Sequence, residues 1–318
     1  MDIWVVGAGG LLGSAVTRAV QPPDRVFPGP RVPWSSAGQA WPVLERGLQA
    51  FHRWRTPGNP WGIVWAAGAG VIASSPTSLA AESDLVVRFA GTLARDVGVG
   101  GGGVGGALLF ASSASVYGGS GASVCDERTA CAPLGGYART KLADEQRLGD
   151  TLAGAVPLAV ARLSTLYGPG QNPHKAQGLV SSMCLEAIRH GTLSVYVPID
   201  TVRDYLFSDD AAVRCLAMLS RAAADGAAAS PLLRVVASHR ATTVGEVARL
   251  VNAVSHRRTR VLQRRTELSP LHVGRLVLTS LDPSMHAFGV TPLPVGVHAV
   301  YQSVLREHLR GRSAAYPR

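Results

Sequence analysis

The chain has 318 residues, of which 47% are hydrophobic and 16% are charged. This length and composition allow a large buried core in one elaborated domain or two, and they argue against a disordered chain or a coiled coil. The net charge of +10 is concentrated in an arginine-rich C-terminal third, where no aromatic residues interleave with the arginines. We therefore expect a solvated basic surface and no nucleic-acid partner.

Signals for export, membrane insertion and metal binding are missing. The strand-like segment Ile3–Val6 follows directly after Met1 and Asp2, which leaves no room for a signal peptide, and no apolar run reaches membrane-spanning length. The four cysteines lack Cys-x-x-Cys spacing, and the histidines do not cluster with them. We expect a cytoplasmic protein with buried free thiols, no membrane partner and no metal.

Apolar runs typical of strands alternate with helical patterns along the chain. The sequence predicts strands at Ile3–Val6, around Val26, and at Gly62–Ala66, Ala107–Ala111, Leu158–Leu163 and Leu232–Ala237, with helices at Ser14–Val20, Leu79–Val97 and Tyr137–Leu152. This alternation predicts an α/β fold with a doubly wound parallel sheet of the Rossmann type. Ligands of such sheets bind at the carboxyl ends of the strands.

A glycine run follows the first predicted strand. Gly7, Gly10 and Gly13 have the spacing Gly-x-x-Gly-x-x-Gly and lead, through Leu11 and Leu12, into the first predicted helix. Glycines let the backbone turn sharply and approach a pyrophosphate at the helix N-terminus. We expect these five residues to bind a dinucleotide cofactor.

The segment after the second predicted strand bears on the choice of cofactor. An acidic residue there would favour NAD, whereas an arginine accommodates the 2′-phosphate of NADP. The chain has Arg31 and no carboxylate between Arg25 and Leu44. We expect a preference for NADP over NAD, and the alternative is that Arg31 only points to solvent.

Two later strand ends carry small or hydroxylated residues. Ala66, Ala67 and Gly68 would let a flat cofactor lie against the strand end, although a tight turn explains them equally well. Serines at positions 112, 113 and 115 end the next predicted strand, about two dozen residues before Tyr137. Their placement lets a hydroxyl converge with Tyr137 on a carbonyl oxygen.

Tyr137 and Lys141 form the most informative pair in the sequence, because the chain has 29 arginines but only Lys141 and Lys175 as lysines. On a helix the two residues lie one turn apart on the same side. A phenol normally titrates near ~10, and a neighbouring cation stabilises its phenolate for general acid/base work. The alternative is a surface tyrosine beside a solvated lysine.

Together these residues resemble the extended short-chain dehydrogenase/reductase superfamily, in particular its NAD-dependent epimerase/dehydratase family, which acts mostly on nucleotide sugars. The resemblance covers nearly the whole chain, in this order: glycines 7–13, Ala66-Ala67, Ser112–Gly118, Tyr137-x-x-x-Lys141, Ala161–Leu163 with Tyr167–Gly170, and Val202–Tyr205 with Asp209-Asp210. It implies that Ser113 supplies the catalytic hydroxyl, with Ser112 and Ser115 as alternatives. It also implies that Tyr137 is the acid/base and that Lys141 binds the nicotinamide ribose.

The resemblance further implies a smaller C-terminal substrate-binding lid. The dinucleotide-binding domain would comprise residues 1–168 and about 201–240, and the lid residues 169–200 and 241–318. The implied substrate-binding residues are Ser115, Thr165, Gly178, Leu179, Tyr196 and Arg203. Arg203 would bind the phosphates, unless it pairs with a carboxylate such as Asp209. A homodimer through the helices Leu79–Val97 and Tyr137–Leu152 is also implied.

Two departures from the family pattern narrow the expected chemistry. Ser164-Thr165-Leu166 stand where sugar epimerases often have an asparagine, and Ala114-Ser115 stand where dehydratases usually have an Asp-Glu pair. The first departure argues against the usual contact with the sugar phosphate. The second argues against dehydration.

We therefore expect an NAD(P)-dependent enzyme that transfers hydride at a hydroxyl or keto carbon of a nucleotide sugar, as a 4-epimerase or a 4-ketoreductase. One alternative is an NADPH-dependent reductase of a non-sugar ketone, such as a polyketide or aromatic intermediate. Another is a non-catalytic dinucleotide-binding protein.

Overall fold

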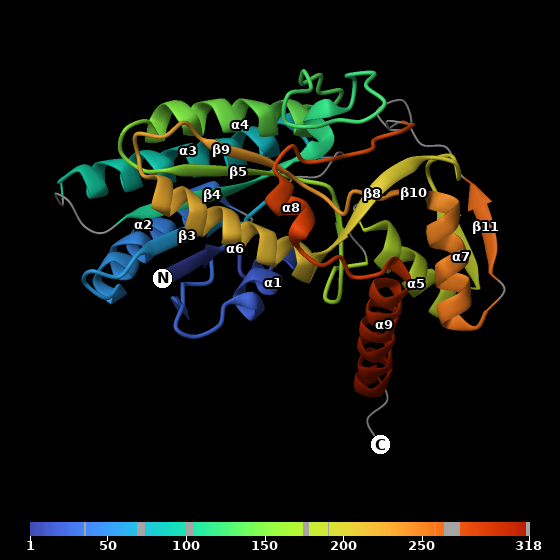
Figure 1. Ribbon diagram of the computed structural model, residues 1–318. Coiled ribbons are helices and arrows are strands. Elements are labelled where there is room, and N and C mark those ends of the chain that lie inside the picture. Colours follow the sequence, from blue (N-terminus) through green and yellow to red (C-terminus); the bar gives the residue numbers. More distant parts are fainter. Residues whose placement is uncertain are drawn as a thin grey trace.

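The structure is a computed structural model that describes residues 1–34, 36–68, 74–99, 105–173, 178–189, 191–257, 259–263 and 274–315. A parallel sheet with helices on both faces forms the larger part, and smaller sheets and helices lie beside it (Figure 1). Within these residues no helix combines the length and apolar character needed to cross a membrane.

The large sheet has six parallel strands in the order β2-β1-β3-β4-β5-β9. Their bounds are β1 Asp2–Val6, β2 Arg25–Val26, β3 Trp61–Trp65, β4 Gly106–Ser113, β5 Leu158–Leu163 and β9 Leu232–Val236. Each predicted strand is present, and the doubly wound parallel fold is confirmed. The strand order reverses between β1 and β3, which is where such sheets bind their ligands.

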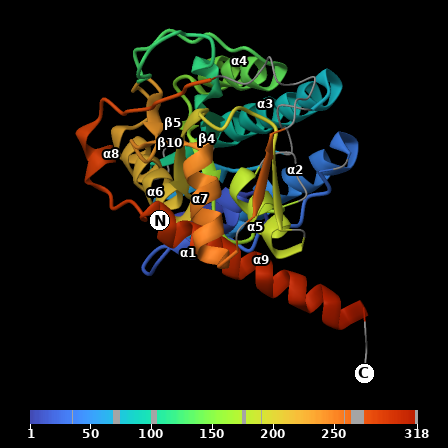
Figure 2. The same ribbon diagram turned by 90° about the vertical axis from the view of Figure 1, so that its right-hand side faces the viewer.

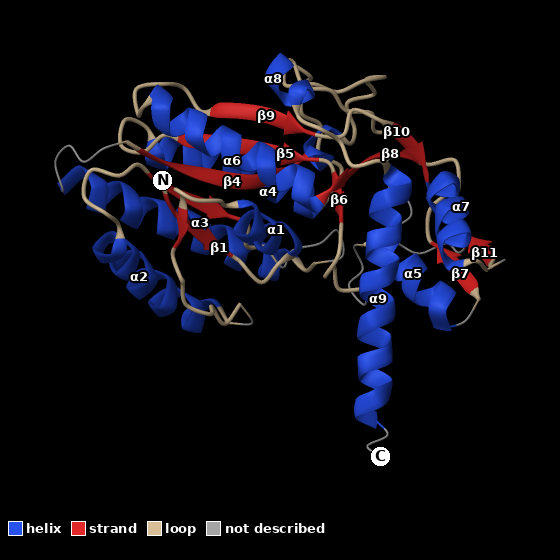
Figure 3. Ribbon diagram, turned by 60° about the horizontal axis from the view of Figure 1, so that its bottom comes forward, coloured by secondary structure: helices blue, strands red, loops and turns tan. Residues whose placement is uncertain are grey.

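Alternation along the strands divides the core into two layers. In β1, Trp4 and Val6 face one cluster of buried side chains, whereas Ile3 and Val5 face the other. The first cluster packs against α2 (Ala37–Trp54), α3 (Pro76–Val99) and α4 (Gly136–Leu152), and the second against α1 (Leu11–Ala19) and α6 (Ser208–Asp225). Figure 3 shows α1 and α6 on the face turned toward the viewer.

A second group of elements lies beyond the carboxyl ends of the parallel strands (Figure 3). It contains the strands β6 Thr165–Tyr167, β7 Thr192–Val195, β8 Val202–Phe207, β10 Ala241–Thr243 and β11 Arg260–Gln263, and the helices α5 Leu179–Arg189, α7 Val244–Ser255 and α9 Leu293–Ala315. The strands form the sheets β10-β8-β6 and β11-β7. The helices α5, α7 and α9 share a valine-rich core, from which α9 runs outward (Figure 2). The predicted division into two domains stays a prediction.

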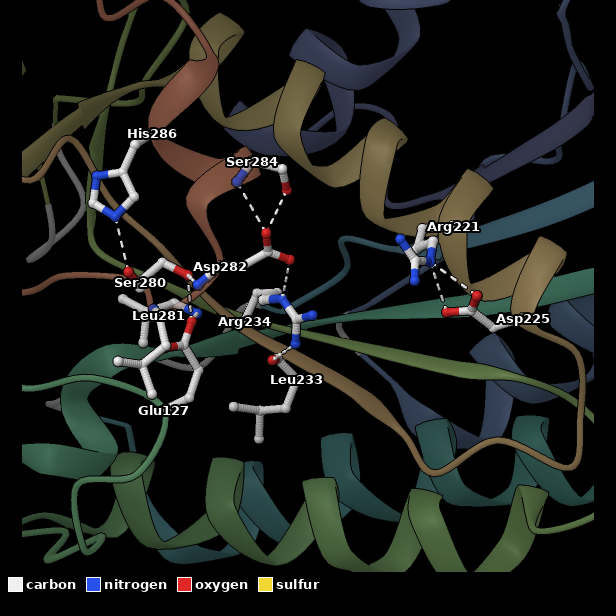
Figure 4. Close-up of polar contacts among 11 residues, drawn as sticks. Glu127, Arg221, Asp225, Leu233, Arg234, Ser280, Leu281, Asp282, Ser284 and His286 are labelled. Carbon is white, nitrogen blue, oxygen red and sulfur yellow. Dashed lines mark hydrogen bonds and ion pairs between the residues drawn. The ribbon is translucent and has the colours of Figure 1, made fainter.

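The chain after β11 returns to the edge of the large sheet. In Figure 4, Glu127 accepts hydrogen bonds from the Ser280 hydroxyl and the Leu281 amide, and Arg234 of β9 pairs with Asp282 at 2.6 Å. The short helix α8 (Pro283–Ala287) follows. These contacts tie together the edge strand, the C-terminal segment and the loop that leads into α4.

Candidate active site

The glycine turn after β1 requires glycine at two of its positions. Gly7 has a φ of 92°, and a Cβ atom there would lie 2.6 Å from the Ala67 amide nitrogen. A Cβ on Gly13 would lie 2.1 Å from the Gly7 carbonyl oxygen. Gly10 is the N-cap of α1 and brings no side chain to cap the helix. The amides of the first turn are therefore available to a phosphate group, and the site fits a dinucleotide.

Three other residues expected to bind the cofactor, Ala66, Ala67 and Gly68, follow β3 beside this turn. The Leu12 side chain is buried in the core, so only its backbone faces the turn. Ala66 and Ala67 continue from β3, and the Ala66 amide donates to the Val6 carbonyl at 2.9 Å. Gly68 and Arg31 are exposed, with Arg31 in the segment that follows β2.

The structure separates the three serines at the end of β4. Ser112 is buried, and its hydroxyl donates to Glu145 on α4. The Ser113 hydroxyl is half-buried and accepts the Ser115 amide at 3.2 Å, which starts the short helix η1 (Ala114–Tyr117). Among the described residues, the Ser115 hydroxyl has no hydrogen-bond partner. Ser113 and Ser115 therefore remain candidates for a substrate contact, whereas Ser112 is engaged in the structure.

Tyr137 and Lys141 lie in the first part of α4, where it passes the end of β4. Tyr137 is half-buried and Lys141 is only 6% exposed. The Lys141 Nζ lies 5.9 Å from the centre of the Tyr137 ring, 4.7 Å from that of Phe110 and 3.9 Å from Glu82 Oε1. A solvated surface lysine would not be buried in this way, so the structure argues against that alternative.

A buried ion pair fixes α4 against the sheet. Arg162 of β5 donates from two guanidinium nitrogens to Glu145, one turn beyond Lys141, at 2.6 and 3.1 Å. Arg162 also donates to the Tyr117 hydroxyl at 2.7 Å. Burial raises the pKa of Tyr117 to about 12 despite this bond, so Tyr117 stays protonated at neutral pH.

The predicted substrate-binding residues lie apart from this group. Thr165 and Tyr196 are exposed, while Gly178 and Leu179 are half-buried at the start of α5. Arg203 of β8 donates to the Val202 carbonyl at 2.8 Å. Ser115, which bonds to Ser113, is the exception. In the described part of the chain, no hydrogen bond or ion pair joins the other five to Ser113, Tyr137 or Lys141.

The alternative partner proposed for Arg203 is used elsewhere. Asp209 pairs with Arg18 at 2.6 Å, and the alternative ion pair of Arg203 with Asp209 is not formed in the structure. No described carboxylate pairs with the Arg203 guanidinium, and burial lowers its pKa below the usual value. An anionic ligand is therefore a physically reasonable partner for Arg203.

Sequence reasoning missed Glu82 and the pair of Glu145 with Arg162. Glu145 follows Lys141 by four residues, so its position on the same helix face was readable from the sequence. For Glu82 no such signal exists, because α3 and α4 are far apart in the chain.

Comparison with known proteins identifies the family. The model of the NAD dependent epimerase/dehydratase family matches residues 66–229, about half of the chain. The chain belongs to this family. The resemblance inferred from the motifs is thereby confirmed.

One known protein resembles part of the chain. A dTDP-L-rhamnose 4-epimerase of Burkholderia thailandensis is 33% identical over 129 residues, which are 40% of this chain and 34% of the relative. The match thus spans about a third of that protein.

Solved structures of similar fold cover nearly the entire chain. UDP-glucose 4-epimerase of Thermus thermophilus in complex with NAD has a TM-score of 0.71 at 18% identity and covers 96% of this chain and 99% of that one. RMD of Pseudomonas aeruginosa complexed with NADPH has a TM-score of 0.70 at 20% identity, with the same coverage. These similarities support the fold.

Proposed function

We propose that the protein is a nicotinamide-dependent oxidoreductase that acts on a nucleotide-linked sugar. The observation that carries this proposal is the burial of Lys141 beside Tyr137, at the carboxyl ends of the parallel strands, where the glycine turn also lies. The family membership and the nucleotide-sugar epimerases among the similar proteins support the substrate class.

Each residue of the group has a chemical role in this proposal. Tyr137 exchanges a proton with the substrate oxygen, and the Ser113 hydroxyl holds that oxygen by a hydrogen bond. Lys141 keeps a positive charge next to the phenol and binds the nicotinamide ribose. The glycine turn and the N-terminus of α1 hold the pyrophosphate. A bound nicotinamide supplies the acceptor or donor of hydride.

The finer assignment rests on a few residues. Arg203 would hold the diphosphate of the substrate, with Ser115, Thr165, Gly178, Leu179 and Tyr196 as further contacts. Arg31 favours NADP, and with it a 4-ketoreductase, whereas the curated relative favours a 4-epimerase. A homodimer through α3 and α4 remains a further proposal.

A reductase of a non-sugar ketone is the second candidate. Ser164-Thr165-Leu166 supply no asparagine amide to a sugar phosphate, and Thr165 is exposed at the start of β6. A purely cofactor-binding protein is less compatible with the structure, because such a protein has no need of a buried lysine beside Tyr137.

A direct assay separates these candidates. The purified protein is incubated with NAD or NADP, oxidised or reduced, and a panel of UDP- and dTDP-hexoses and their 4-keto forms. Nuclear magnetic resonance of the sugar detects an epimer, and nicotinamide absorbance detects net reduction. An epimer without net change in absorbance supports the epimerase, and consumption of NADPH supports the ketoreductase. Binding of neither diphosphate would contradict the nucleotide-sugar proposal.

A further inference from the structure

Glu82 of α3 lies beside Lys141, a residue of the candidate site. Its side chain is 19% exposed, and its Oε1 lies 3.9 Å from the Lys141 Nζ. A Cβ atom on Gly68 would lie 3.1 Å from the same oxygen and 3.8 Å from the Nζ. A carboxylate, the ammonium and the loop after β3 therefore meet at one point. Glu82 has no part in the chemistry proposed for Tyr137 and Ser113.

Neighbouring contacts already join the two helices. Ser83 donates to Asp144, and Asp84 pairs with Arg147 at 3.3 Å, so residues next to Glu82 attach α3 to α4 without it. The outer pair is solvated, with side chains 73% and 45% exposed, whereas Lys141 is 8% exposed on the same measure. Water screens an ion pair so little exposed only weakly, so Glu82 should affect the Lys141 ammonium more strongly than Asp84 affects Arg147.

We propose that Glu82 is a positioning residue for Lys141. Its carboxylate holds the ammonium between the loop after β3 and the Tyr137 ring before the cofactor binds, and it offsets part of the positive charge that acts on the Tyr137 phenol. The inference rests on the proposed function, since it concerns the lysine of that site. Its test is possible without a substrate.

The scarcity of lysine gives a direct measurement. Reductive methylation of the cofactor-free protein, followed by mass spectrometry, reports the reactivity of Lys141, with Lys175 as a reference in the same molecule. In Glu82→Gln, which keeps the shape and removes the charge, methylation of Lys141 should rise by about threefold or more. Asp84→Asn is the matched control, because it removes a nearby charge of α3 that pairs with Arg147. It should leave the methylation of Lys141 unchanged. Equal methylation of Lys141 in wild type and Glu82→Gln would overturn the proposal.

A pH profile separates positioning from a purely structural role. Removing a negative charge favours the deprotonated phenol, so the pH of half-maximal oxidation should fall by about half a unit in Glu82→Gln and not in Asp84→Asn. Glu82→Asp keeps the charge and should restore the wild-type profile. A profile that does not move, with unchanged melting temperature, would contradict the charge offset and with it the proposal. If the protein neither epimerises, oxidises nor reduces a nucleotide sugar, the proposed function fails, and the methylation experiment still decides the role of Glu82.

Discussion

Lys141 and Arg203 differ in which groups of the protein contact their positively charged ends. Lys141 is buried and contacts side chains from α3 and β4. Arg203 bonds to the carbonyl of the preceding residue, and Tyr196, another predicted substrate contact, is 46% exposed. We call the surroundings of Lys141 the organised region, because protein side chains hold its ammonium. No described carboxylate pairs with the Arg203 guanidinium, which is therefore left for a ligand to bind. This difference is expected if the proposed roles hold, because a group that supports proton transfer needs fixed geometry and a group that binds a flexible anion does not.

Breaking the support beneath α4 should have the largest effect. Arg162→Met leaves the Glu145 carboxylate buried without its partner, and we expect the free energy of unfolding in urea to fall by about 3–5 kcal/mol. Arg147→Met removes the exposed ion pair with Asp84 and the hydrogen bond to the Ser83 hydroxyl, and it should cost only about 1–2 kcal/mol. The double variant Arg162→Met, Glu145→Met should recover much of the loss. A loss in Arg162→Met as small as in the control would show that the network is not what holds α4.

Removing the Tyr137 hydroxyl tests the chemistry of the organised region and leaves the ion pair of Arg162 and Glu145 in place. Tyr137→Phe should lower single-turnover hydride transfer by at least about a hundredfold, with cofactor affinity retained. Nicotinamide absorbance in a rapid-mixing experiment measures the rate, and Tyr301→Phe on α9 is the control for loss of a phenol. Turnover near the wild-type rate would remove Tyr137 from the acid/base role.

The organised region was also the more predictable one. The glycine turn, the strand ends and the pair Tyr137 and Lys141 follow from local spacing and from the alternation of strands and helices, and the structure places them along one edge of the sheet. What the sequence does not contain is which helix faces are neighbours. Glu82 and Arg162 come to α4 from α3 and β5, and periodicity gives no information about such pairs.

Other elements of the fold were not predicted from the sequence, for different reasons. The helix α2 was not among the predicted elements, although Trp41, Leu44, Leu48 and Phe51 are buried at helical spacing, because Pro42 interrupts the pattern. The sheet of β7 and β11 joins segments from opposite sides of β8 in the sequence. Such long-range pairing cannot be predicted from short apolar runs.

The Arg203 region can be tested by the affinity for the substrate diphosphate. In Arg203→Ala, binding of UDP or dTDP should weaken by roughly 1.5–3 kcal/mol, the range for hydrogen bonds to charged groups, while the stability of the fold changes little. Calorimetry at two salt concentrations measures the loss, and Arg249→Ala on α7 controls for net charge. Equal affinity in wild type and Arg203→Ala would show that the diphosphate binds elsewhere. Arg203 would then not be the group that a ligand pairs with.

The smallest expected effect concerns Arg31, an exposed arginine that we propose binds the opposite end of the cofactor from Lys141. A solvated guanidinium gains little from one phosphate, because water screens the pair, so its contribution to affinity is on the order of 1 kcal/mol or less. We expect the cofactor-free protein to bind NADPH more tightly than NADH, and Arg31→Ala to reduce that preference by about threefold to fivefold without changing NADH affinity. Arg46→Ala, an exposed arginine of α2, controls for net charge. Fluorescence titration at fixed salt measures both affinities, and raising the salt should shrink the NADPH preference in wild type more than in Arg31→Ala. A wild-type protein that prefers NADH would contradict the cofactor assignment and remove the reason for favouring a ketoreductase over an epimerase.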